Sequence, residues 1–265
     1  MNELDTDTEV SEVVKRRRGI YLLPNLFTTA ALFSGFYAVV AAINGDFWIA
    51  GMAIFVAMIL DGMDGRVARL TNTQSEFGVQ YDSLSDMVSF GVAPALVVFE
   101  WALSGMQDMG PTWGKLGWIG AFTYTACAAL RLARFNTQVG VIDKRYFQGL
   151  PSPAAAAVVA SLVWVGDDLG AHGLPIEVVA WLLTVSVALL MVSNIRYYSF
   201  KEFDFRYRVP FMAIVVLAVV FAVAQVHLPM TLFLIFLVYM LSGPILTVLQ
   251  RRQRRQQRVG GGEIE

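Results

Sequence analysis

Long apolar stretches make up most of this chain, and short polar segments separate them. Each stretch is about long enough to cross the ~30 Å of hydrocarbon in a bilayer as a helix. They cover residues 26–43, 46–61, 86–104, 116–134, 153–169, 174–193, 209–226 and 229–249. None alternates apolar and polar residues with a period of two, which argues against a β-barrel. The pattern predicts an all-α, polytopic integral membrane protein, a bundle of about eight transmembrane helices.

Composition agrees with this pattern. Of the 265 residues, 56% are hydrophobic and only 15% are charged, and the mean hydropathy is +0.57. Such a chain is too apolar for a soluble domain. The second stretch is short for a membrane span, so we expect its helix to continue beyond residue 61 as far as Arg69.

The basic residues predict an orientation. If the N-terminus is cytoplasmic and the chain crosses eight times, all 20 Lys and Arg residues except Lys115 fall on the cytoplasmic side. This asymmetry follows the positive-inside rule. We therefore expect a protein integral to the cytoplasmic (inner) membrane with both termini in the cytoplasm.

Both ends of the chain are polar. Residues 1–14 lack the apolar segment of a signal peptide, so we expect a disordered start. The basic residues 15–18 precede a segment, 19–23, that is either a short amphipathic helix on anionic headgroups or only a topology anchor. The arginine-rich tail, 251–258, is expected to contact lipid headgroups, and no nucleic-acid partner is expected.

Four aspartates lie between the second and third apolar stretches. Asp61 and Asp64 are spaced i,i+3, and Asp82 and Asp86 are spaced i,i+4, so each pair projects from one face of its own helix. Four clustered carboxylates repel one another unless divalent cations lie between them. Ligands that are all oxygen indicate Mg²⁺, Mn²⁺ or Ca²⁺. The spacing predicts a metal site at the membrane edge.

Small residues and one arginine accompany the aspartates. Gly65 and Ala68 share the helical face of the first pair, and Gly78 lies one turn before the second pair. A bulky polar ligand could therefore approach the backbone, and Arg69 offers a fork of donors suited to phosphate. Two metals across a diphosphate would neutralise developing charge. Phosphoryl-type transfer is the chemistry that this arrangement favours.

The aspartate pairs also fit simpler interpretations when each is taken alone. Each aspartate pair alone could mark the polar end of a membrane helix or a helix start favoured by the macrodipole. All four aspartates together, at these spacings, favour a functional site, because charged side chains within a membrane are energetically costly. A cation-coupled secondary transporter would place acidic residues deep within spans and carry an internal repeat. Glu100 and Glu177 instead lie near outer ends, and no repeat is evident.

Other reactive side chains are few. Cys127 is the only cysteine, so one chain can form neither a disulfide nor a thiolate zinc site. His172 and His227 both fall in predicted outer loops. The general base must therefore be sought among the carboxylates.

The pattern D-x2-D-G-x2-A-R-x8-G-x3-D-x3-D, from Asp61 to Asp86, resembles the signature of the CDP-alcohol phosphotransferases and matches it at every fixed position. These are integral membrane enzymes of phospholipid synthesis. Pro24, Asn25 and Thr28 resemble the family's Pro-Asn-x2-Thr segment, although alone they also fit an ordinary proline-started helix. The resemblance implies an enzyme that displaces CMP from a CDP-linked lipid with an alcohol.

The resemblance also implies residue roles. Asp61, Asp64 and Asp82 would hold a first Mg²⁺ or Mn²⁺, Asp61, Asp82 and Asp86 would be available to a second, and Asp86 would be the general base. The nucleotide would be bound by Pro24, Asn25, Thr28, Gly65, Ala68, Arg69 and Gly78. The expected division is a disordered, basic N-terminus (1–19), a six-helix catalytic core (20–195), two additional helices (196–250) and a basic tail (251–265). A homodimer is expected from the family.

A second cluster of polar residues could bind the acceptor alcohol. Arg131, Arg134 and Asn136 close the fourth predicted helix, and residues 147–153 open the fifth. The two arginines could bind an acceptor's carboxylate or a lipid phosphate, or serve only as positive-inside anchors. Both segments resemble the phosphatidylserine synthase branch of the family. That implies CDP-diacylglycerol and L-serine as substrates. Glycerol 3-phosphate, inositol phosphate and choline are the alternative acceptors.

Overall fold

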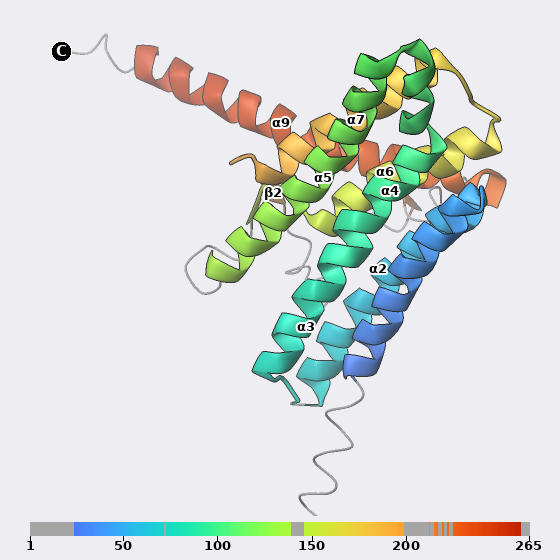
Figure 1. Ribbon diagram of the computed structural model, residues 1–265. Helices are drawn as coiled ribbons and strands as arrows, with labels where there is room; N and C mark the ends of the chain where they lie inside the picture. Colours follow the sequence, from blue (N-terminus) through green and yellow to red (C-terminus); the bar gives the residue numbers. More distant parts are fainter. Residues whose placement is uncertain are drawn as a thin grey trace, which may run out of the picture.

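The computed structural model describes residues 24–71, 73–138, 146–198, 212, 215, 216, 219, 222 and 225–260. Within these residues the chain is almost entirely helical (Figure 1). The predicted disordered start and amphipathic helix lie outside the described residues, as does most of the seventh apolar stretch. The domain boundaries inferred from the sequence stay predictions.

The described elements are helices apart from two short strands. After a first helix, Pro24–Ile43, they are α2 (Phe47–Leu70), α3 (Glu76–Asp86), the π-helix η1 (Met87–Val92), α4 (Ala93–Trp101), the 3-10 helix η2 (Leu103–Met109), α5 (Pro111–Gln138), β1 (Tyr146–Gln148), α6 (Ser152–Asp168), α7 (Leu174–Val192), β2 (Arg196–Tyr198) and α9 (Leu228–Gly260).

Five helical segments in the described part of the chain are long and apolar enough to cross a membrane. They are Pro24–Ile43, Phe47–Leu70, Glu76–Trp101, Leu174–Val192 and Leu228–Val248. Two further predicted stretches are helical as α5 and α6. The all-α polytopic fold is thus confirmed, while eight crossings stay a prediction. As expected from the short second stretch, α2 continues past the apolar residues to Leu70.

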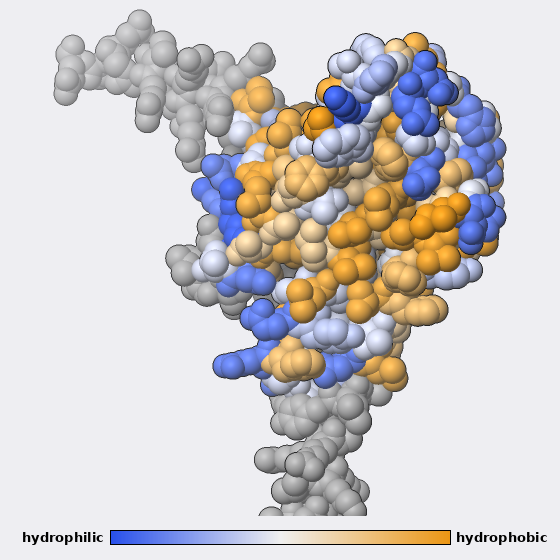
Figure 2. Space-filling model, in the orientation of Figure 1, coloured by the Kyte–Doolittle hydropathy of each residue, from blue (hydrophilic) through white to orange (hydrophobic). Residues whose placement is uncertain are grey.

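Apolar side chains also cover the outside of the protein. Figure 2 shows them in a broad band across one face, with hydrophilic residues toward both ends. On the first helix, Phe33 and Phe36 are 67% and 60% exposed. In a bilayer such a band faces lipid, because the hydrocarbon core solvates apolar side chains.

The short helix α6 is the centre of the bundle. Every residue from Ala154 to Gly166 is buried, and α6 packs against α2, α4, α7 and α9. The alanines of its first turns and Gly51 of α2 let the helices approach closely. A Cβ on Gly51 would lie 3.2 Å from Cβ of Trp164.

A π-helix follows Asp86 directly. The six residues of η1 join α3 to α4 in one continuous span. Widening a helix disturbs its regular hydrogen bonds, and side chains of α5 supply donors here: Tyr124 Oη donates to the Phe90 carbonyl at 3.1 Å and Thr125 Oγ1 to the Gly91 carbonyl at 3.4 Å. These contacts tie α5 to the turn after Asp86. π-segments often occur at functional sites.

The first helix packs closely on this span. Ser85 Oγ donates to the Thr28 carbonyl at 3.2 Å, and Ser89 Oγ donates to the Ala31 carbonyl at 3.1 Å. Gly35 permits the approach, because a Cβ there would lie 2.6 Å from Ser89 Oγ. The start of the first helix is thereby held beside the aspartates.

A small antiparallel sheet joins two connections at one end of the bundle. Phe147 of β1 pairs with Tyr197 of β2. Next to the sheet, the Gly149 amide donates to the Ile195 carbonyl at 2.8 Å, and the Leu150 amide donates to the Leu190 carbonyl at 3.0 Å. The segment that leads into α6 is therefore fixed against the end of α7.

Gly149→Ala is expected to destabilise the protein by about 2 kcal/mol. Gly149 has φ +77°, and an added Cβ would collide with the Met191 carbonyl oxygen. The measurement is thermal unfolding in detergent. The control is Gly62→Ala, because that helical glycine has open space around it and alanine favours a helix. An equal midpoint for both variants would contradict the prediction.

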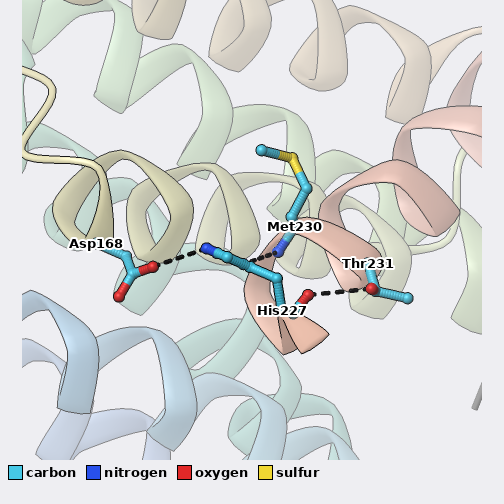
Figure 3. A network of polar contacts seen from close by, with 4 residues as sticks. All are labelled: Asp168, His227, Met230 and Thr231. Atoms are coloured by element: carbon cyan, nitrogen blue, oxygen red, sulfur yellow. Dashed lines mark hydrogen bonds and ion pairs between the residues drawn. The ribbon is translucent and has the colours of Figure 1, made fainter. Parts of the chain in front are cut away.

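The long helix α9 is anchored at two points. Tyr197 Oη donates to the Met240 carbonyl at 3.0 Å, and a Cβ on Gly243 would collide with the Tyr197 ring. At its start, His227 Nε2 lies 2.9 Å from Asp168 Oδ2 at the end of α6, and the Met230 amide donates to His227 Nδ1 (Figure 3). His227 therefore has a structural position here, linking α6 to α9.

Candidate active site

The aspartates come together where α2 and α3 lie side by side. Oxygen atoms of Asp61, Asp64 and Asp82 all lie within 4.8 Å of one another. Asp64 is only 6% exposed, and Thr28 Oγ1 donates to its Oδ2 at 2.7 Å. The first helix therefore orients one carboxylate of the cluster.

The donor set fits a divalent cation. Oδ1 of Asp82 and Oδ1 of Asp86 are buried and have no hydrogen-bond partner among the described residues. Buried carboxylate oxygens without partners are costly unless a cation or a proton compensates their charge. Asp86 lies outside the group of three and interacts electrostatically with Asp61 and Asp82. The cluster is thus a candidate metal centre with Asp86 at its border.

A cavity of about 260 Å³ adjoins the aspartates. All seven residues that the sequence suggested for the nucleotide line it: Pro24, Asn25, Thr28, Gly65, Ala68, Arg69 and Gly78. Asp64 and Asp82 also face it, whereas Asp86 is not among its lining residues. The structure therefore brings these seven residues to one side of the carboxylates.

Sequence reasoning missed four further lining residues, Thr73, Gln74, Ser75 and Val79. Three of them belong to the polar connection between α2 and α3. Ser75 is the N-cap of α3 and accepts the Gly78 amide at 3.0 Å. A serine directly before Glu76 was a helix N-cap signal that could have located this wall.

Arg131 of α5 is a buried residue near Asp86. It is 8% exposed, its Nη1 donates to Ser152 Oγ at 2.7 Å, and its Nε has no partner among the described residues. Its charge interacts with that of Asp86. A buried guanidinium beside a carboxylate is not an exposed topology anchor. It can bind an anionic group that enters the site.

Arg134 and Asn136 are placed differently. Arg134 Nη1 donates to Asn194 Oδ1 at 3.4 Å, and Asn136 Nδ2 donates to Ser83 Oγ at 3.1 Å. Asn136 is exposed and Arg134 partly exposed. The three residues predicted for the acceptor thus contact three different parts of the chain, and of the three only Arg131 is buried.

Comparisons with known proteins agree with the motif. The family model described as CDP-alcohol phosphatidyltransferase matches residues 21–192. A CDP-diacylglycerol–serine O-phosphatidyltransferase of Helicobacter pylori is 37% identical over 202 residues, covering 76% of this chain and 82% of the relative. The protein of that name in Methanocaldococcus jannaschii is 33% identical over 192 residues, covering 72% and 81%. An archaetidylserine synthase of Methanothermobacter thermautotrophicus is 32% identical over 185 residues, covering 69% and 72%.

Proposed function

The chain belongs to the CDP-alcohol phosphatidyltransferase family, and on that premise we propose that it transfers the phosphatidyl group of CDP-diacylglycerol to L-serine. The products are phosphatidylserine and CMP. Relatives in two organisms are named CDP-diacylglycerol–serine O-phosphatidyltransferase. The observation that carries the proposal is the cluster of carboxylates beside a cavity that all seven residues predicted for the nucleotide line, with the buried guanidinium of Arg131 near Asp86.

The cavity is the proposed site for the cytidine diphosphate. Gly65, Ala68 and Gly78 leave its walls bare, so the ligand can approach the backbone. Arg69 supplies donors suited to a phosphate or to a base carbonyl. The diacylglycerol tails would lie in the bilayer along the exposed apolar faces of the helices.

Two divalent cations, Mg²⁺ or Mn²⁺, are proposed for the carboxylates. Asp61, Asp64 and Asp82 would hold one, and Asp61, Asp82 and Asp86 would hold the other. When bound, the cations would supply positive charge that neutralises the charge on the departing CMP. Thr28 keeps Asp64 oriented through its 2.7 Å hydrogen bond.

The acceptor would enter from the side of Arg131. Its carboxylate would bind the guanidinium, and its hydroxyl would donate to Asp86, the proposed general base. The serine oxygen bonds to the phosphatidyl phosphorus, the bond from that phosphorus to the CMP oxygen breaks, and the hydroxyl proton passes to Asp86. An in-line displacement would require the acceptor and the leaving group on opposite sides of the phosphorus.

We place the site at the cytoplasmic face of the inner membrane. Arg66 and Arg69 follow the aspartates on α2. Asn136 of α5 contacts Ser83 of α3, and Arg134 of α5 contacts Asn194. Arg134 therefore lies at the same end of the helix bundle. This clustering supports a cytoplasmic location through the positive-inside rule. The homodimer implied by the family stays a prediction.

The test is CMP release by the purified protein in detergent with CDP-diacylglycerol and Mg²⁺ or Mn²⁺. The acceptors are L-serine, ethanolamine, glycerol 3-phosphate, inositol phosphate and choline, each alone. We expect release with serine and much less with ethanolamine, which is serine without its carboxylate. CMP release with only one of the other acceptors would agree with the proposed chemistry at the carboxylates and would exclude serine as the acceptor. Absence of CMP release with every acceptor would contradict the proposal that the protein is an enzyme of this family's chemistry.

A further inference from the structure

We propose that Ser152, the first residue of α6, is a positioning residue that makes the site select an acceptor with a carboxylate. It does so by holding the guanidinium of Arg131, whose Nη1 donates to Ser152 Oγ at 2.7 Å. The inference rests on the proposed function. It gives a role in acceptor choice to an uncharged residue of the segment 147–153.

Contacts between α5 and the span that contains Asp86 place Arg131 near this carboxylate. Two pairs of residues join the span to α5, one by close approach and one by a hydrogen bond: Gly91 with Ala128, and Ser83 with Asn136. Residue numbers rise on one helix as they fall on the other, so the two helices run antiparallel. Asp86 and Arg131 both lie between these contacts, within about one helical turn of each other along the bundle. The interaction between their charges agrees with this placement.

The hydrogen bond between Arg131 and Ser152 is shielded from water. Arg131 is 8% exposed and Ser152 is 1% exposed. At such depth water does not readily replace a lost partner, and a buried donor without an acceptor is costly. The guanidinium therefore keeps the orientation in which Ser152 accepts from Nη1.

Ser152 is itself held by the backbone around it. It begins α6, where the Ala155 amide donates to the Pro151 carbonyl at 2.9 Å. Just before it, two backbone hydrogen bonds join residues 149–150 to the end of α7 and to the segment that follows α7. A hydroxyl at such a fixed position can lock the rotamer of a long side chain.

The orientation of Arg131 decides which of its donors an acceptor can reach. A guanidinium has five N–H donors and no acceptor. With Nη1 at Ser152, the edge formed by Nε and Nη2 is left for a ligand, and Nε is buried without a partner among the described residues. Two parallel donors of this kind match the two oxygens of a carboxylate. Ser152 therefore acts on the acceptor through Arg131 and does not touch it.

Ser152→Ala is expected to raise KM for L-serine about 10-fold, the lower end of the effect of a hydrogen bond to a charged group. KM for CDP-diacylglycerol is expected to stay unchanged. The decisive measurement is the ratio of kcat/KM for serine to that for ethanolamine, which we expect to fall about 10-fold. A general loss of packing would affect both acceptors alike, whereas a misoriented Arg131 affects only the acceptor with a carboxylate.

The matched control is Ser161→Ala. Ser161 lies on the same helix and is completely buried, but its Oγ donates to the Ala157 carbonyl of α6 itself, at 2.6 Å. This variant also loses a buried hydroxyl from α6 without removing a partner of Arg131. It is expected to keep the wild-type ratio.

A double variant tests whether Ser152 acts through Arg131. Arg131→Gln alone is expected to lower the ratio, because it removes the charge that binds the acceptor's carboxylate. Adding Ser152→Ala should then lower the ratio no further, since two residues that work as one unit are not additive. A further fall in the double variant would show that Ser152 affects the acceptor by another route and would overturn its positioning role.

A wild-type ratio in a folded Ser152→Ala variant would also overturn the inference. If that variant does not fold, Ser152→Cys carries the same test, because a thiol of similar size is a weaker acceptor, and an unchanged ratio there would be equally decisive. Absence of serine-dependent CMP release by the wild-type protein would reject the proposed function, and the inference with it. An active wild-type protein with unaffected variants would reject only the role of Ser152.

Discussion

Asp86→Asn is expected to lower kcat for CMP release by about 10³-fold, within the range for loss of a general base. The substitution keeps the size of the side chain and removes its capacity to take the serine proton. Asp86 is not among the residues that line the cavity, so nucleotide binding is expected to be largely kept. The measurement is steady-state CMP release together with equilibrium binding of CDP.

The matched control is Asp108→Asn, which removes an exposed carboxylate from η2. That variant is expected to turn over like the wild-type protein. Full activity in Asp86→Asn would exclude Asp86 as the base. Equal losses of CDP binding and turnover would instead assign Asp86 to binding of the metal and nucleotide.

The aspartate site could be predicted because its spacing is local. Asp61 and Asp64 share a helical face, and so do Asp82 and Asp86, whatever the surrounding fold. That the two helices meet could not be deduced from periodicity. Only the family resemblance linked Thr28 to the aspartates, and the hydrogen bond from Thr28 to Asp64 now gives that link a physical form.

Other features depend on packing that a sequence pattern does not contain. Arg131 and Arg134 are one turn apart and looked equivalent, yet one is buried beside Asp86 and the other reaches Asn194. The difference arises from Ser152, which meets Arg131 only because the sheet fixes the start of α6. The π-helix after Asp86 was also missed, since the sequence Met87–Val92, with Ser89 and Gly91, is equally compatible with an ordinary membrane helix.

The contribution of α9 was the least predictable. Its apolar sequence indicates a membrane helix and nothing more. In the structure Tyr239 packs beside Tyr197 of β2, with ring centroids 5.7 Å apart. Contacts between residues so far apart along the chain follow from tertiary structure alone.

Removal of divalent cations is expected to reduce CMP release by more than about 10³-fold, because the charge on the departing CMP would no longer be neutralised. Mg²⁺ or Mn²⁺ added back after chelation is expected to restore activity. Three carboxylates with oxygens within 4.8 Å of one another also repel when no cation is present. Cation binding should therefore raise the midpoint of thermal unfolding, a readout that does not depend on turnover.

The variant Asp82→Asn distinguishes stabilisation by cations bound at the aspartates from stabilisation by salt in general. The substitution removes one charge from the cluster, so the protein should lose most of the cation-dependent rise in midpoint together with its activity. Asp46→Asn, at the opposite end of α2 and exposed, should keep both. If the chelated wild-type protein retained full activity, the carboxylates would have another role. The buried oxygens of Asp82 and Asp86 would then require protons in place of metal.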